Sequence, residues 1–251
     1  MDFQELADVI QYDQGLTTNI LKLVNSAYFG FSHKINSLEH AIAMLGVKRI
    51  YYLTIGSAVS PVLDKEVQGY DLSEGDLWQH SVGVALGAEK IAENSDIEAP
   101  DYTFTAGLLI DIGKIALSTF LDLDPQPVLN LAYKKNIPFN IAEEKILGIS
   151  HPEAGAILLD NWNLPDELIQ VVRYHHQPNE LEGDKTVVDL VHIADILMME
   201  AGIGDGQDGL NYRSCQESSE RIHFDQIDEE KILVDIFTEI NQLSGRFVNE
   251  E

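Results

Sequence analysis

Apolar residues recur at helical spacing along almost the whole chain. Residues 228–243 are a clear case, because their apolar positions fall on one face of a helix. No segment gives a convincing strand pattern, and none carries the turn signal of a β-hairpin. The pattern therefore predicts an all-α fold, a multi-helix bundle.

Capping residues, glycines and prolines predict where these helices begin and end. Ser37 is expected to cap a short helix that a glycine closes, and Pro61 is expected to stop the helix after it. Ser73 and Ser150 each begin a capping-box pattern, with helices that end near residues 92 and 162. Residues 202–220 are rich in Gly, Asp and Ser, which predicts a long loop. The other predicted helices cover residues 2–11, 16–24, 38–45, 47–59, 102–120, 127–135, 140–147, 164–174, 186–200 and 228–243.

The predicted helix 102–120 holds one carboxylate, Asp111, inside an apolar run. An ionised carboxylate that is buried alone costs several kcal/mol, so it shifts its pKa, pairs or binds a metal. Two interpretations stay open. Asp111 lies near the surface and pairs with Lys114 at i+3. Alternatively it is buried, as its apolar i−3, i+1 and i+4 neighbours suggest, and it needs a partner from elsewhere.

Charge limits the classes of partner. The 251 residues include 42 acidic and 16 basic side chains, which gives a formal net charge of −26. Such a surface repels phosphate backbones and anionic lipids, so we expect neither a nucleic-acid nor a membrane partner. The single cysteine excludes an internal disulfide and fits a reducing compartment. We find no signal peptide and no apolar run of ~18 residues, so the expected location is the cytoplasm.

Histidines and acids at helix positions are candidate metal ligands, since imidazole and carboxylate groups suit iron, manganese or zinc. Asp76 and His80 stand at i and i+4 and share a helix face. Taken one at a time, each candidate is explained more simply by a structural role, such as a helix cap or a pair with a distant basic residue. The candidates are Asp76, His80, Asp111, His151, His175, His176 and Asp195.

The order of these candidates resembles that of the HD phosphohydrolase superfamily, whose helical bundle presents His, His-Asp and Asp to a metal. Gly-Leu-Leu-Ile-Asp-Ile-Gly-Lys at 107–114, Ser-His-Pro-Glu at 150–153 and Tyr-His-His at 174–176 are similar to its signature segments. Residues 10–30 and 37–46 resemble the hallmark of the HDOD family, the HD-related output domains. The resemblance covers about residues 6–201 and implies an N-terminal HDOD part and an HD-like core. The tail that follows, with an acidic loop and an amphipathic helix, carries no motif of the family. These parts cover residues 1–66, 67–201 and 202–251.

One departure bears on function. Ile110 stands where the resemblance implies a histidine ligand, and isoleucine cannot bind a metal. The Gly-Tyr-Pro of the cyclic-dinucleotide phosphodiesterase branch does not follow His176. The resemblance then implies a signal-transduction or regulatory module, non-catalytic or weakly active, that acts through contacts with signalling proteins.

Two alternatives remain. The first is a metal-dependent phosphohydrolase that cleaves a phosphodiester or phosphomonoester, with Asp111 and Lys114 as its catalytic residues. The second is a scaffold in which all candidates are structural. For the site itself we expect the candidates to converge on one pocket, with Ile110 filling the space of the lost ligand. At most one divalent ion (Fe, Mn, Zn or Mg) is expected, held by His151, His175 and His176 with Asp111.

Overall fold

The computed structural model describes residues 10, 13–121, 125–204, 206 and 211–247. The prediction of an all-α fold is confirmed: within these ranges, the only β pairing is an isolated bridge between Val67 and Leu72. In chain order the elements are α2 (Gln14–Val24), η1 (Ala27–Phe29), α3 (Leu38–Leu45), α4 (Val47–Leu63), α5 (Asp76–Asn94), α6 (Thr103–Leu109), α7 (Ile112–Leu121), α8 (Gln126–Lys135), α9 (Phe139–Leu147), α10 (His151–Asn161), α11 (Asp166–Tyr174), η2 (Pro178–Glu180), α12 (Thr186–Glu200), α13 (Gln216–Arg221), η3 (Phe224–Gln226) and α14 (Glu229–Phe247).

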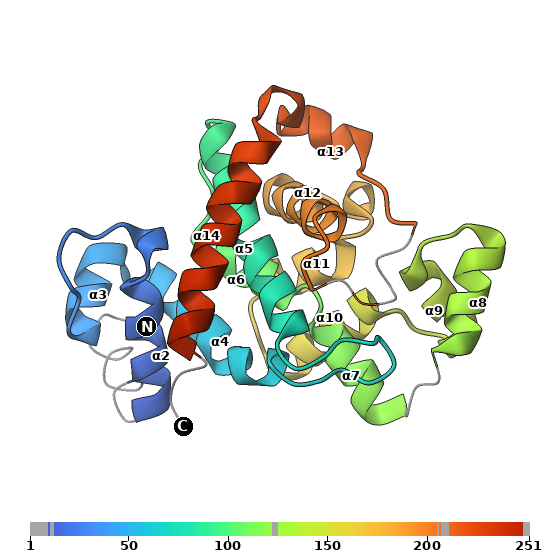
Figure 1. Cartoon of the computed structure of the whole chain (residues 1–251), viewed down its shortest axis with the longest axis horizontal. Helices are drawn as coiled ribbons and strands as arrows, with labels where there is room; N and C mark the ends of the chain where they lie inside the picture. The colour runs from blue at the N-terminus through green and yellow to red at the C-terminus, as the bar shows by residue number, and fades with distance from the viewer. Residues whose placement is uncertain (1–9, 11–12, 122–124, 205, 207–210, 248–251) are drawn as a thin grey trace.

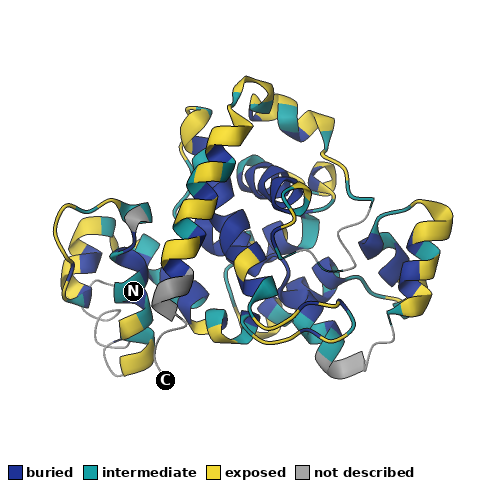
Figure 2. Ribbon diagram, in the orientation of Figure 1, coloured by how far each residue is buried: buried dark blue, intermediate teal, exposed yellow. Residues whose placement is uncertain are grey.

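Helix α5 is the axis of the bundle, and α6, α12 and α14 pack around it (Figure 1). Its glycines allow this close approach. A Cβ atom at Gly87 would lie 3.1 Å from Ala194 Cβ on α12 and 3.3 Å from Ile236 Cδ1 on α14. Helices α2 and α3 lie at one end of the molecule and α8 and α9 at the other, and α4 runs from the first end toward the middle (Figure 1). Many of the buried residues lie between the two ends (Figure 2).

The N-terminal helices follow the predicted pattern with one correction. Ser37 caps α3 by accepting a hydrogen bond from His40 N, and Gly46 ends that helix. The prediction that Pro61 stops the next helix is wrong, because α4 continues to Leu63. A proline in the last turn removes only its own N–H, and the helix can close two residues later. The helix predicted over residues 2–11 lies outside the described residues, apart from residue 10.

The single helix predicted over residues 102–120 is two helices, α6 and α7, with a break at Ile110 and Asp111. Each part docks through a glycine on a different partner. A Cβ at Gly107 would lie 2.7 Å from Ala85 Cα on α5, whereas one at Gly113 would lie 1.9 Å from the His151 carbonyl oxygen on α10. Because the two glycines fix two separate close approaches, the chain changes course between them.

The prediction of an unbroken loop over residues 202–220 is also wrong. Its last part forms the short helix α13, which docks on α12. Arg221 and Ser218 both bind the buried carboxylate of Asp189: Arg221 Nη2 lies 2.7 Å from Oδ1, and Ser218 Oγ donates to the same oxygen at 2.6 Å. A carboxylate on one helix therefore organises a segment whose composition alone indicates a loop.

Helix α4 joins the N-terminal helices to the bundle. Arg49 Nη2 lies 3.0 Å from Glu89 Oε1 on α5, and Thr105 Oγ1 on α6 donates to the Tyr52 carbonyl oxygen at 2.9 Å. One hydrophobic core runs through both groups of helices. The part boundaries after residues 66 and 201 remain predictions. No helix in the described part of the chain combines the length and apolar character that crossing a bilayer requires.

Candidate metal centre

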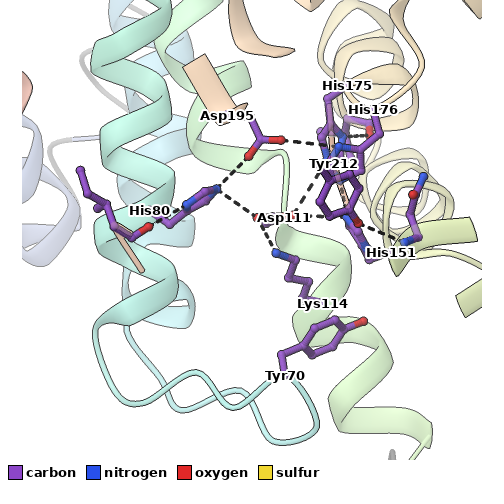
Figure 3. A network of polar contacts seen from close by, with 12 residues as sticks. Tyr70, His80, Asp111, Lys114, His151, His175, His176, Asp195 and Tyr212 are labelled. Atoms are coloured by element: carbon purple, nitrogen blue, oxygen red, sulfur yellow. Dashed lines mark hydrogen bonds and ion pairs between the residues drawn. The ribbon is translucent and has the colours of Figure 1, made fainter. Parts of the chain in front are cut away.

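Asp111 lies at the break between α6 and α7, with 1% of its surface exposed. Its Oδ2 accepts a hydrogen bond from Lys114 Nζ at 2.9 Å, so the predicted i+3 pair forms. The surface location that went with that pairing is wrong, because Lys114 is itself only 8% exposed. The ion pair of Asp111 and Lys114 is therefore buried, and the carboxylate of Asp111 also faces side chains from other helices (Figure 3).

His80 and Asp195 approach Asp111 from α5 and α12. His80 Nε2 lies 2.9 Å from Asp195 Oδ1 and 3.6 Å from Asp111 Oδ2. The other ring nitrogen, Nδ1, donates to the Ile203 carbonyl oxygen at 3.0 Å. The backbone after α12 thus fixes the imidazole so that Nε2 faces the two carboxylates.

Three more histidines arrive from α10 and from the end of α11. His151 Nε2 and His175 Nε2 lie 3.5 and 4.0 Å from Asp111 Oδ1. His176 Nδ1 lies 3.5 Å from Asp195 Oδ2. The two carboxylates are therefore shared between His80 on one side and the three histidines on the other, and we call these six residues the buried cluster.

Glu143 on α9 holds His151 in place. Its Oε2 accepts hydrogen bonds from both the backbone N and the Nδ1 of His151, each at 2.8 Å, and its Oε1 accepts from Tyr70 OH at 2.5 Å. Ser150 makes no side-chain cap, so the capping box predicted there is wrong. Glu143, one helix earlier, takes over that role, which leaves His151 Nε2 directed at Asp111.

The ring of Tyr212 closes the outer side of the buried cluster. It stacks on His176, with ring centroids 4.1 Å apart and planes 19° from parallel. Its hydroxyl accepts a hydrogen bond from Asn140 N at 3.0 Å. Behind it, His175 Nδ1 donates to the Val172 carbonyl oxygen at 2.7 Å, so His175 Nε2 keeps its lone pair and points inward.

Electrostatics separate the members of the buried cluster. Burial opposes ionisation of Asp111, but Lys114 and the nearby imidazoles outweigh it and hold the pKa of this carboxyl below its ordinary value. Burial likewise works against the imidazolium form of His80, yet the hydrogen bond and charge of Asp195 raise the pKa of His80. Glu143 raises the pKa of His151 against the same burial.

The remaining two histidines behave in the opposite way. Burial lowers the pKa of His175 to about 4, although Asp195 and Asp111 work against this effect. Burial and the neighbouring His175 and His151 hold the pKa of His176 well below its usual range. Both rings are therefore neutral near pH 7, which is the form that binds a metal.

The donor set fits a divalent transition metal. Ligand atoms of His80, Asp111 and Asp195 lie within 4.8 Å of one another, and so do those of His151, His175 and His176. Four buried atoms that could bind a metal have no hydrogen-bond partner among the described residues: Asp111 Oδ1, Asp195 Oδ2, His175 Nε2 and His176 Nδ1. Buried polar atoms are normally satisfied, so a cluster of facing lone pairs is what a cation would complete.

One predicted candidate stays apart. Asp76 is the first residue of α5, and its Oδ2 accepts a hydrogen bond from Ser73 N at 2.8 Å. Its carboxylate closes the turn that leads into the helix, and neither group of converging ligand atoms includes it, so the prediction that it joins the other candidates is wrong. Asp76 shares a helix face with His80, but its carboxylate is hydrogen-bonded to the backbone of the turn before α5. Ile110 is fully buried between α6 and α7.

Sequence reasoning missed three residues around the buried cluster: Glu143, Tyr70 and Tyr212. Glu143 and Glu144 are adjacent on α9, and only the burial of Glu143 distinguishes them. Tyr70 lies in a segment whose polar composition indicates a linker. Tyr212 lies in the predicted loop. No local signal marks any of them, since each acts through a contact with a residue distant in sequence.

Fold and site together define an all-α protein with a buried cluster of histidines and aspartates. The chain belongs to the HDOD domain family, whose model matches residues 1–178. The predicted family is therefore confirmed.

Solved structures of similar fold agree with this assignment. An HDOD domain protein with unknown function from Geobacter sulfurreducens is 25% identical, covers 98% of this chain and 85% of its own, and has a TM-score of 0.73. A phosphohydrolase-like protein from Shewanella amazonensis SB2B is 20% identical over 97% of this chain and 86% of its own, with a TM-score of 0.67. At that identity the second likeness concerns the fold alone.

An uncharacterized protein of Treponema pallidum (strain Nichols) is 28% identical over 203 residues. The match covers 78% of this chain but only 38% of that relative. The chain thus spans well under half the length of the curated relative that it matches.

Proposed function

We propose that this chain is a regulatory HDOD module that acts through contacts with signalling proteins, and whose buried cluster holds one divalent metal ion without turning over a substrate. The observation that carries the proposal is the closure of the buried cluster around Asp111. The loss of a ligand at Ile110 supports it independently.

The buried cluster is closed to solvent on the side where its histidines come nearest to the surface. Two cavities of about 360 and 350 Å³ border the cluster there, and His176 is its only member in their linings. Tyr212 stacks on that histidine. Hydrolysis of a phosphate ester on a metal requires substrate and water to reach the ion together. Asp111, which is 1% exposed, offers a substrate no such approach.

Ile110 removes a donor from the centre of the site. Its side chain is fully buried beside Asp111 and belongs to the continuous hydrophobic core. An ion held by Asp111 therefore relies on the histidines for its remaining ligands. When bound, a metal would offset the charge of the buried carboxylates and supply Lewis-acid chemistry, with His151, His175 and His176 as its nitrogen ligands.

The second candidate function is hydrolysis of a phosphate ester by the same cluster. The convergence of His80, Asp111 and Asp195 favours it, as does the ammonium group of Lys114 at 2.9 Å from Asp111 Oδ2, which could bind a phosphoryl oxygen. In that case, Tyr212 would have to leave His176 before a substrate could enter.

One experiment distinguishes the two functions. The protein is purified without chelator, its metal content is measured by elemental analysis, and turnover of bis(p-nitrophenyl) phosphate is measured with added Mn²⁺. The same measurements are made on Asp111→Ala and on Asp160→Asn, a matched control that alters an exposed carboxylate on α10.

We expect one equivalent of metal in the wild type and in the control, at least tenfold less in Asp111→Ala, and equal background turnover in all three. Metal-dependent turnover that Asp111→Ala abolishes and Asp160→Asn preserves would establish the phosphohydrolase instead. Two equivalents of metal per chain would contradict the single-ion site.

A further inference from the structure

The N-terminal helices carry a charge opposite to that of the whole molecule. Residues 14–63 contain the cations Lys22, Lys34, Lys48 and Arg49 but a single carboxylate, Glu39, and of these cations Arg49 is paired with a glutamate of α5. The complete chain has a net charge of −26. Positive charge is thus segregated at one end of a strongly acidic protein, at α2 to α4 (Figure 1). A surface of this kind attracts anions locally while the remaining surface repels them.

A cavity of about 680 Å³ opens at this end, between α2 and the irregular segment of residues 31–36. We call it the N-terminal pocket. None of its lining residues is acidic, and its cationic side chains come from both walls. It is lined by Thr18, Leu21, Lys22, Asn25, Ser26, Phe31, Ser32, His33, Lys34, Ile35 and Asn36.

The two walls of the N-terminal pocket are fastened together. Asn25 Nδ2 donates to the Ile35 carbonyl oxygen at 2.7 Å, and Ile35 N donates to Asn25 Oδ1 at the same distance. A further bond from Asn25 Nδ2 to the Leu21 carbonyl oxygen, 2.8 Å long, ties this amide to α2. The amide group of Asn25 thus pairs with both backbone polar groups of Ile35, as a neighbouring strand would. These hydrogen bonds fix the distance between the two walls of the cavity.

One lining group lacks a partner. Ser26 is 5% exposed, and its hydroxyl makes no hydrogen bond within the described residues. Leaving a buried hydroxyl unpaired costs free energy, which an occupant able to accept its hydrogen bond would recover. The unpaired hydroxyl is a second observation, independent of charge, that points to a ligand with acceptor oxygens.

Size and lining define the class of ligand. Pockets of ~300–1,000 Å³ suit small molecules, whereas an extended polymer needs a long groove. Lysine binds phosphate as a point charge, and the apolar surface of Leu21 and Phe31 suits an organic group. We propose that the N-terminal pocket binds a small organic phosphate ester, with its phosphate near Lys34 and Ser26. This proposal does not depend on the function of the buried cluster.

The test uses the full chain and isothermal titration calorimetry with adenosine 5′-monophosphate. Adenosine and inorganic phosphate serve as probes of the two halves of the ligand. Lys34→Gln removes one exposed cation from the lining. Lys48→Gln is the matched control, because Lys48 is also an exposed lysine of the basic segment but does not line the pocket. Ser26→Ala removes the unpaired hydroxyl.

We expect the nucleotide to bind at least tenfold more tightly than adenosine. Lys34→Gln should weaken the nucleotide about tenfold and Ser26→Ala several-fold, with no change in Lys48→Gln. Absence of binding by the nucleotide and by phosphate would overturn the proposal, as would equal losses in the two lysine variants. Binding of a duplex oligonucleotide instead of the nucleotide would assign the basic surface to nucleic acid. Nucleotide binding that is lost in Asp111→Ala but kept in Lys34→Gln would place the ligand at the buried cluster.

Discussion

The buried cluster and the N-terminal pocket both gather polar side chains, but they do so in opposite ways. The cluster brings carboxylates and imidazoles into the protein interior, where Asp111 is 1% exposed and Tyr212 covers the nearest way in. The N-terminal pocket gathers cations and hydroxyls around an open cavity. The signature residues of a family thus lie in the closed site, whereas the accessible site is made by residues that no catalytic motif marks.

The difference shows that residue types indicate which chemistry a site can carry out. Whether a ligand from solution can reach those residues decides whether that chemistry takes place. A closed set of imidazoles and carboxylates suits an ion that stays bound. An open basic pocket suits a ligand that exchanges with solution. The following predictions disturb the closed site, the connection between the two regions, and the protonation of the closed site, in order of decreasing effect.

The largest effect is expected from Gly113→Ala. The new Cβ would lie 1.9 Å from the His151 carbonyl oxygen and 2.6 Å from Gly155 N, and backbone atoms cannot rotate away. We expect a loss of more than ~3 kcal/mol in the free energy of unfolding, measured by urea denaturation. Gly15→Ala on α2 is the control, because its Cβ would meet only Asp13 Oδ1 at 3.4 Å. A Gly113→Ala protein as stable as the control would refute the close packing of α7 on α10.

This packing also explains what the sequence could not predict. The apolar run around Asp111 keeps helical spacing through the break, so periodicity alone indicates one helix. The break depends on Gly107 and Gly113 meeting α5 and α10, which are contacts of tertiary structure. In contrast, the end of α3 was predictable, because Ser37 and Gly46 act locally.

In the candidate site, too, some residues were predictable from the sequence and others depend on tertiary contacts. Asp111 and Asp195 were predictable because carboxylates inside apolar helices need partners. The position of Asp76 was not, since its hydrogen bond to Ser73 N depends on the geometry of the turn. Glu143 could not be told from its neighbour Glu144, because both stand on a short amphipathic helix and the contact with His151 selects only one.

The next effect concerns the connection between the two regions. Arg49 of α4 binds Glu89 of α5, with side chains 22% and 6% exposed. Arg49→Met should destabilise the protein by about 2–3 kcal/mol, because the buried carboxyl of Glu89, whose pKa burial raises to about 8, loses the hydrogen bonds that Arg49 donates to it. The double variant Arg49→Met, Glu89→Met should recover most of this loss. If the double variant is no more stable than the single one, the cost comes from lost packing rather than from the unpaired carboxyl group.

The smallest effect of the three is a pH dependence of stability in the metal-free protein. The pKa of His175 is about 4 in the folded state, against ~6.5 in an unfolded chain. Between these values the unfolded chain binds a proton that the folded chain does not, so stability falls as the pH falls. From pH 7 to pH 5 this loss amounts to about 2 kcal/mol. His175→Asn, which cannot titrate, should lose about that much less stability over the same range.

His80 supplies a control of opposite sign. Its pKa is raised in the folded state, chiefly by Asp195 acting against burial, so the stability it contributes is complete below pH ~6.5 and is lost as the pH rises further. His80→Asn should therefore flatten the curve on the alkaline side, and His175→Asn should flatten it on the acid side. Urea midpoints at pH 5, 6, 7 and 8 in the presence of a chelator separate the two. Identical curves for both variants would show that the two histidines share one environment, which contradicts the division between proton-binding and neutral imidazoles in the buried cluster.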